Sequence, residues 1–123
     1  MIRRALAGTL ALFLSLGLSL ASFYVVREKG RRLISAAESA LFVRYDDMEN
    51  RAGDMLTFWK ENRKLFFALL KHSDADALSL SFDRLSTALE RGDREIALEC
   101  VSEIRAEMRA ILDGETPGIG NIF

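Results

Sequence analysis

The chain contains one histidine, His72, and two acidic residues follow it closely, at Asp74 and Asp76. Imidazole and carboxylate groups at this spacing could hold a metal ion, or the imidazole could serve a Ser/His/Asp or Cys/His centre. The sequence offers no second histidine, no glycine-containing calcium loop and no paired ligand motif. Histidine at a helix C-terminus and aspartate at the next N-cap explain these residues better. We therefore expect a noncatalytic protein without a metal site or cofactor.

Aromatic residues are concentrated between positions 58 and 67. At helical spacing, Trp59 and Phe66 share one face, and Asn62 lies near the same apolar arc. An aromatic-rich helix in a bundle usually forms core, whereas a polar amide in such surroundings can mark a ligand pocket. Both interpretations stay open, and the candidate core or pocket residues are Trp59, Asn62, Phe66 and His72.

An acidic row recurs every four residues near the C-terminal end, at Glu95, Glu99, Glu103 and Glu107. Like charges at this spacing mildly destabilise a helix, so the row could bind cations or a basic partner. Arginines stand beside it in the sequence. We therefore expect an ordinary solvated face. The single cysteine, Cys100, lies among apolar residues, and we expect a buried thiol.

Charge divides the chain into two parts. Residues 1–32 carry six Lys/Arg and one Glu, a net charge of +5, and the remaining 11 Lys/Arg and 17 Asp/Glu give residues 33–123 a net charge of −6. An acidic domain of this kind lacks the basic surface that nucleic acids require. We expect no nucleic-acid partner.

Residues 5–26 form an apolar run of 22 residues without a charge, flanked by basic residues on both sides. This length spans the hydrocarbon core of a bilayer as one helix. The alternative is a cleaved signal peptide, because Ser19-Leu20-Ala21 has small residues at the spacing that a signal peptidase reads. The aromatic residues Phe23 and Tyr24, followed by basic residues, are typical of a membrane interface. We expect an uncleaved, single-pass anchor in the cell membrane.

The orientation of this anchor is open to two arguments. More Lys/Arg residues follow the span than precede it, which favours a cytoplasmic domain by the positive-inside rule. A short N-terminal tail before a signal-like apolar run favours translocation, and long domains translocate largely regardless of charge. We expect the domain on the extracytoplasmic side.

Small residues fall on one side of the predicted membrane helix, within about 80° of one another at 100° per residue. These residues are Gly8, Ala11, Ser15, Ser19 and Ser22. In lipid, a stripe of this kind lets helix backbones approach and favours association. We expect an interface with a second copy or with an integral-membrane partner, although small residues are common enough in this segment to align by chance.

The rest of the chain shows helical periodicity in four stretches, about 31–50, 54–71, 73–90 and 93–113. Gly53-Asp54 and Gly92-Asp93 each predict a break followed by an N-cap, Ser73 to Asp76 resembles a capping box, and Gly114 predicts the last helix end. We expect an all-α fold: a transmembrane helix at 1–30, a bundle of about four amphipathic helices in two hairpins at 31–114, and a tail at 115–123.

The apolar positions also predict what each helix buries. The first bundle helix has Ile34, Ala37, Leu41, Tyr45 and Met48 on one face, and it can continue from the membrane helix because Gly30 costs only ~1 kcal/mol. The second has the widest apolar arc, so we expect it to be the most buried helix, in contact with at least two others.

Several of these features together resemble a bacterial family known as domain of unknown function 4363. The resemblance rests on Trp59, on His72 followed by the two aspartates, on the Gly92-Asp93 turn and on the terminal Asn121-Ile122-Phe123. It extends over nearly the whole chain. It implies a small helical protein with an N-terminal membrane helix, and it assigns no catalytic residue.

Three classes of function remain. We favour a membrane-anchored interaction or assembly module, which associates through the stripe and uses its bundle as a docking surface. The alternative is a ligand-sensing or ligand-binding domain with a pocket between bundle helices. An enzyme is disfavoured, because no nucleophile and base occur together in a recognisable pattern.

Overall fold

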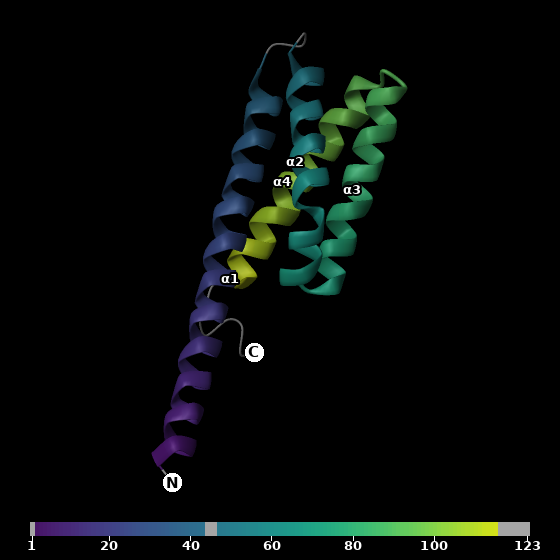
Figure 1. The fold of residues 1–123 in the computed structure, drawn as a ribbon. Helices are drawn as coiled ribbons and strands as arrows, with labels where there is room; N and C mark the ends of the chain where they lie inside the picture. The colour runs from purple at the N-terminus through teal and green to yellow at the C-terminus, as the bar shows by residue number, and fades with distance from the viewer. Residues whose placement is uncertain (1, 44–46, 116–123) are drawn as a thin grey trace.

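The computed structural model describes residues 2–43 and 47–115, and all regular structure in this part of the chain is helical. The four helices are α1 (Ile2–Phe42), α2 (Met48–Leu69), α3 (His72–Glu90) and α4 (Arg94–Glu115). Figure 1 shows two helical hairpins, α1 with α2 and α3 with α4, and α1 extending well beyond the bundle toward the N-terminus. The predicted all-α fold, an N-terminal apolar helix followed by a small bundle, is confirmed.

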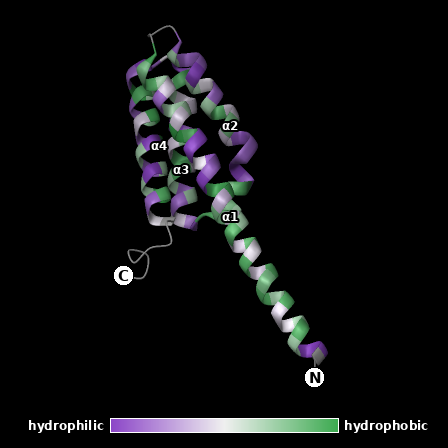
Figure 2. Ribbon diagram, turned by 90° about the vertical axis from the view of Figure 1, so that its left-hand side faces the viewer, coloured by the Kyte–Doolittle hydropathy of each residue, from purple (hydrophilic) through white to green (hydrophobic). Residues whose placement is uncertain are grey.

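Helix α1 joins the predicted membrane segment and the first bundle helix without a break. Its side chains from Arg3 to Ala21 are exposed, and burial begins at Ser22. From Val26 onward the buried positions recur at spacings of four and three, at Val26, Gly30, Leu33, Ala37 and Ala40. This is the seam of a helix that packs in a bundle. Figure 2 shows the change along α1, from a largely apolar isolated half to a half covered by the other helices.

The helices surround one core in the order α1, α2, α3, α4. Helix α4 packs extensively against both α1 and α3, while α2 packs against α1 and makes fewer contacts with α3. The expectation that the second helix is the most buried was therefore wrong. Phe58, Leu65 and Phe67 on its wide apolar arc are only half-buried, because α2 makes few contacts with α3 and still fewer with α4.

The connection between α1 and α2 differs from the prediction. Helix α1 ends at Phe42 rather than near residue 50, and α2 begins at Met48, so Gly53 and Asp54 lie inside α2. The apolar seam of Met48, Ala52 and Met55 continues through this pair, and packing along it outweighs the ~1 kcal/mol that glycine costs in a helix. Tyr45, predicted on the buried face, lies outside the described residues.

The other two connections differ from each other. Helix α3 begins at His72, and the side chain of Lys71, which precedes it, makes no capping hydrogen bond. The predicted capping box at Ser73 therefore does not start the helix. The α3–α4 turn matches its prediction. Gly92 has φ of +68°, its N–H donates to Leu89 O, and the Asp93 N–H donates to Ala88 O. This is the Schellman motif, which requires a left-handed residue.

Asp93 then caps α4, because its Oδ1 accepts the Ile96 N–H at 3.3 Å. Helix α4 passes through Gly114 and ends at Glu115, one residue beyond the predicted stop. Pro117 and the rest of the predicted tail, 116–123, lie outside the described residues.

An aromatic stack fills the core between α2 and α3. The Trp59 ring is stacked with Phe82, at 4.7 Å between centroids and 8° between planes, and with Phe66, at 5.8 Å and 20°. Cys100 is fully buried, as predicted. Burial raises the pKa of its thiol, so this sulfur acts as a small apolar group in the core.

Candidate membrane-facing site

The small-residue stripe is divided into two parts by the bundle. Around Gly8 no atom lies within 4 Å of the position that a Cβ would occupy, and Ala11 is exposed. Ser15, Ser19 and Ser22 instead line a groove, and Ser22 is half-buried. The part of the stripe nearest the N-terminus is therefore free for a second helix.

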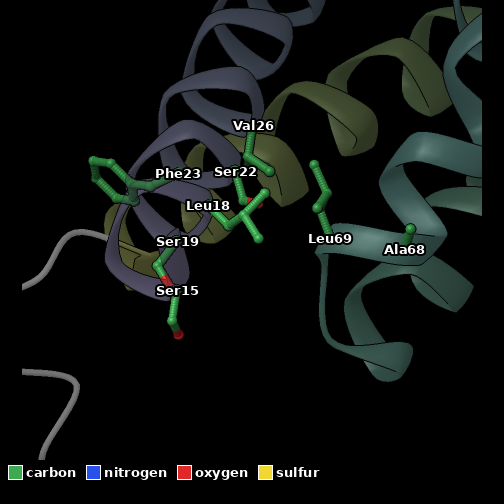
Figure 3. A pocket seen from close by; sticks show the side chains of 8 residues that line it. All are labelled: Ser15, Leu18, Ser19, Ser22, Phe23, Val26, Ala68 and Leu69. Carbon is green, nitrogen blue, oxygen red and sulfur yellow. The ribbon is translucent and has the colours of Figure 1, made fainter. Parts of the chain in front are cut away.

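The groove lies where α1 passes the C-terminal end of α2 and has a volume of about 530 Å³. Figure 3 shows Leu18, Ser22 and Val26 of α1 on the side that faces Leu69 of α2. The end of α2 thus reaches the level of α1 at which the apolar run finishes.

The aromatic candidates are core residues. Trp59 is 4% exposed and Phe66 is 1% exposed, and both belong to the aromatic stack. Asn62 is half-buried and its Nδ2 donates to the carbonyl oxygen of Phe58, one turn earlier, at 2.9 Å. This bond pairs one amide N–H of Asn62 with the backbone of α2 itself.

His72 does not join this group. It is exposed and occupies the first position of α3, so it lies neither in the core nor at the C-terminus of a helix. His72 was predicted at the C-terminus of the second helix, because that helix was expected to continue to Lys71, whereas α2 ends at Leu69. Among residues 2–43 and 47–115, no three His, Cys, Asp or Glu side chains are grouped so as to hold a metal ion.

Glu107 departs from the expectation of a solvated acidic row. Glu95 and Glu99 are exposed, but Glu107 is half-buried against α3, where Ser81 Oγ donates to its Oε1 at 2.8 Å. Its Oε2 is buried and has no hydrogen-bond partner. Burial raises the pKa of this carboxyl, and the bond from Ser81 opposes the shift.

The helix geometry explains this difference. Four residues at 100° each advance the helix by 400°, so a row repeated every four residues turns by about 40° per step and by about 120° over three steps. Glu95 and Glu107 must then face different directions. This drift was the available signal in the sequence, and it was missed.

A second missed feature is an ion-pair cluster between α1 and α4. Arg105 donates twice to Glu38 Oε1, at 3.1 and 3.2 Å, and Arg109 donates to the same oxygen at 2.8 Å. These residues are 67 and 71 positions apart in sequence. No local pattern pairs them, because the contact follows from the antiparallel packing of the two helices.

The described residues include one helix that is long and apolar enough to cross a membrane, and it is α1. Residues 32–122, which start in the second half of α1, match a protein family with the description "Domain of unknown function (DUF4363)". The chain belongs to the DUF4363 family. The resemblance that the sequence showed to this family is thus confirmed.

The DUF4363 match begins within α1 and includes α2, α3 and α4, so it covers the bundle and excludes the exposed first half of α1. The family description assigns no activity. Comparison with curated proteins found no match. Comparison with solved structures found no match either.

Proposed function

We propose that this protein is a noncatalytic, single-pass membrane protein whose bundle serves as an interaction or assembly module at the membrane surface. The observation that carries the proposal is the continuity of α1. One uninterrupted helix provides an exposed apolar half and one wall of the bundle. The bundle therefore has a fixed position relative to the apolar half, as a module that presents a surface to membrane partners requires.

The cell membrane is the proposed location, with the bundle on the extracytoplasmic side. At 1.5 Å per residue, the 22 residues of the apolar run extend about 33 Å, close to the thickness of a bilayer core. Gly8 and Ala11 lie on the freely exposed part of this helix. Small side chains there support association with a second copy or with an integral-membrane partner.

The test replaces Gly8, Ala11 and Ser15 by Leu in one variant. All three positions are exposed, so the bundle should fold unchanged and the helix should still insert, while the added bulk prevents close helix approach. In-membrane crosslinking should show association in the wild type and its loss in the variant. A control with Leu10→Ile and Leu14→Ile should associate normally. Equal association in both variants would remove the stripe as an interface.

A second candidate function is ligand binding between α3 and α4. A groove of about 300 Å³ there is lined by Lys71, Asp74 and Glu107, among others. Its two carboxylates would suit an amine-bearing small molecule. Such ligands should raise the unfolding temperature of the wild type, and Glu107→Gln should abolish that rise. Unchanged temperatures for a panel of amines would reject this candidate.

A further inference from the structure

A second groove lies on the opposite flank of the membrane-proximal end, between α1 and the C-terminal part of α4. It has a volume of about 410 Å³ and is lined by Arg27, Arg31, Ile34, Arg109, Leu112 and Asp113. Two of its arginines come from α1 and one from α4. We call this set of three, Arg27, Arg31 and Arg109, the arginine groove. It exists only when the bundle is folded, because residues 27 and 109 are far apart in sequence.

The arginine groove has an excess of positive charge. Arg105 and Arg109 share the single carboxylate of Glu38, and Arg105 alone makes two hydrogen bonds to it. Both arginines share this one carboxylate, with Arg109 at 2.8 Å, so the cluster of three side chains keeps one positive charge in excess. Glu28 is paired with Arg32 at 3.2 Å. Glu38 and Asp113 are then two carboxylates beside four guanidinium groups, those of Arg27, Arg31, Arg105 and Arg109.

Arg27 and Arg31 also repel each other. They are four residues apart on α1, and both line a further shallow groove on the outer side of the helix. Like charges at this spacing mildly destabilise a helix. Among the described residues, neither has a carboxylate within ion-pair distance, and Arg27 lies 5.8 Å from the centroid of the Phe23 ring. An anion between them would relieve this repulsion.

The position of the groove identifies the anion. The apolar run ends at Val26, and the next turn and a half of α1 contains Arg27 and Arg31. If the run spans the bilayer, these side chains lie at the depth of the lipid headgroups. Tyr24, which is 66% exposed, lies beside them at the same interface. The anion available at this depth is a phospholipid phosphate, and guanidinium groups bind phosphate oxygens in pairs.

We propose that the arginine groove binds the headgroup phosphate of an anionic phospholipid, with Arg27 and Arg31 contributed by the anchor and Arg109 by α4. The proposal rests on the membrane insertion of α1 proposed above. A headgroup with net negative charge is preferred over a zwitterionic one, because the excess of guanidinium groups over carboxylates favours a net anion. The bound lipid would hold the end of α4 against the membrane helix.

The test uses the full chain reconstituted in bilayers of phosphatidylcholine mixed with phosphatidylglycerol. Native mass spectrometry of the released protein then counts the lipids of each class that stay bound. The wild type should retain phosphatidylglycerol preferentially. Arg31→Gln and Arg109→Gln should each reduce this preference about fivefold, since a basic side chain near an anionic surface contributes about that factor. Asp113→Asn should increase it.

Matched controls are Arg51→Gln and Arg91→Gln, which remove exposed arginines at the opposite end of the bundle. Both should keep the wild-type preference. Arg31 makes no ion pair among the described residues, so its variant should fold normally even if Arg109→Gln does not. Equal preferences in the groove and control variants would overturn the proposal.

A soluble anion is the other source of phosphate. Inorganic phosphate added to the reconstituted protein should leave the retained phosphatidylglycerol unchanged, and its displacement would overturn the lipid assignment. Membrane fractionation separates this outcome from a failure of the proposed function. A chain that inserts and associates but has no lipid preference contradicts only the headgroup site, whereas a chain recovered outside the membrane contradicts the anchor itself.

Discussion

Glu107 places a carboxylate in a half-buried contact between α4 and α3, where one oxygen is bonded to Ser81 and the other has no partner. Because burial raises its pKa in the folded state, the folded protein binds this proton more tightly than the unfolded chain does. The stabilisation that the protonated Glu107 gives to the folded state is then fully present below the ordinary glutamate pKa of 4.5. It is lost as the pH rises through the raised value.

Glu107→Gln should therefore stabilise the bundle at neutral pH, by about 1 kcal/mol, because an ionised oxygen without a partner is replaced by a neutral group. The gain should shrink as the pH falls and disappear near pH 4. Denaturant unfolding, followed by the fluorescence of Trp59, the single tryptophan, measures the gain at neutral pH and its decrease at lower pH. Glu99→Gln, on the exposed part of the row, is the control and should show no such pH dependence. A variant no more stable than wild type at neutral pH would reject this account.

Gly30 is a second residue whose role depends on a distant neighbour. A Cβ at this position would lie 2.7 Å from Met108 Cε and 2.9 Å from Leu112 Cδ2. The glycine therefore allows α1 and α4 to approach closely. The sequence showed Gly30 only as a weak point in a helix, because its partners are about 80 positions away along the chain.

Gly30→Leu should destabilise the bundle by ~1–3 kcal/mol, as overpacked cores do. Gly30→Ala should change the stability little, because better helix propensity offsets contacts with two flexible side-chain ends. Gly53→Leu is the matched control, since no atom lies within 4 Å of its Cβ position. The same unfolding measurement applies, and equal midpoints for the two Leu variants would contradict the close approach.

At the scale of the helices, two identical dipeptides have opposite roles. Gly92-Asp93 forms the α3–α4 turn, and Gly53-Asp54 lies within α2. Gly92→Ala should cost ~1–2 kcal/mol, because the left-handed conformation is strained for any residue with a Cβ. Gly53→Ala should instead stabilise by up to ~1 kcal/mol. The thermal unfolding temperature should fall for Gly92→Ala and rise for Gly53→Ala. Shifts of the same sign would contradict the different roles of the two glycines.

This contrast shows how far the sequence could predict the helices. Helical periodicity was sufficient to identify the apolar N-terminal helix and the all-α bundle, and Gly92-Asp93 identified the α3–α4 turn. For Trp59 and Phe66 the sequence left core and pocket open, and the structure places both in the core. At Gly53-Asp54 the local signal failed because a continuous buried seam outweighs a single unfavourable residue. At Ser73 the predicted cap failed because α3 already begins at His72. The contacts that define the grooves, such as Arg109 with Glu38, join distant segments and have no local signature.

At the scale of the whole molecule, α1 determines where the bundle lies. Its side chains are exposed up to Ala21, and the buried seam starts at Val26. Removal of residues 1–21 by a signal peptidase would therefore leave the bundle intact, and the product would be a folded protein without an anchor. The two interpretations of the apolar run thus predict the same bundle, which is tethered to the membrane in one case and released from it in the other.

Membrane fractionation with intact-mass measurement tests the central claim most directly. If α1 is an uncleaved span, the chain should stay in the membrane pellet after alkaline carbonate washing, with a mass that includes the residues of the apolar run. A folded, soluble form that begins at Ser22 would contradict the claim. That result would show cleavage after Ser19-Leu20-Ala21 and would remove both the stripe and the headgroup site from the function of the protein.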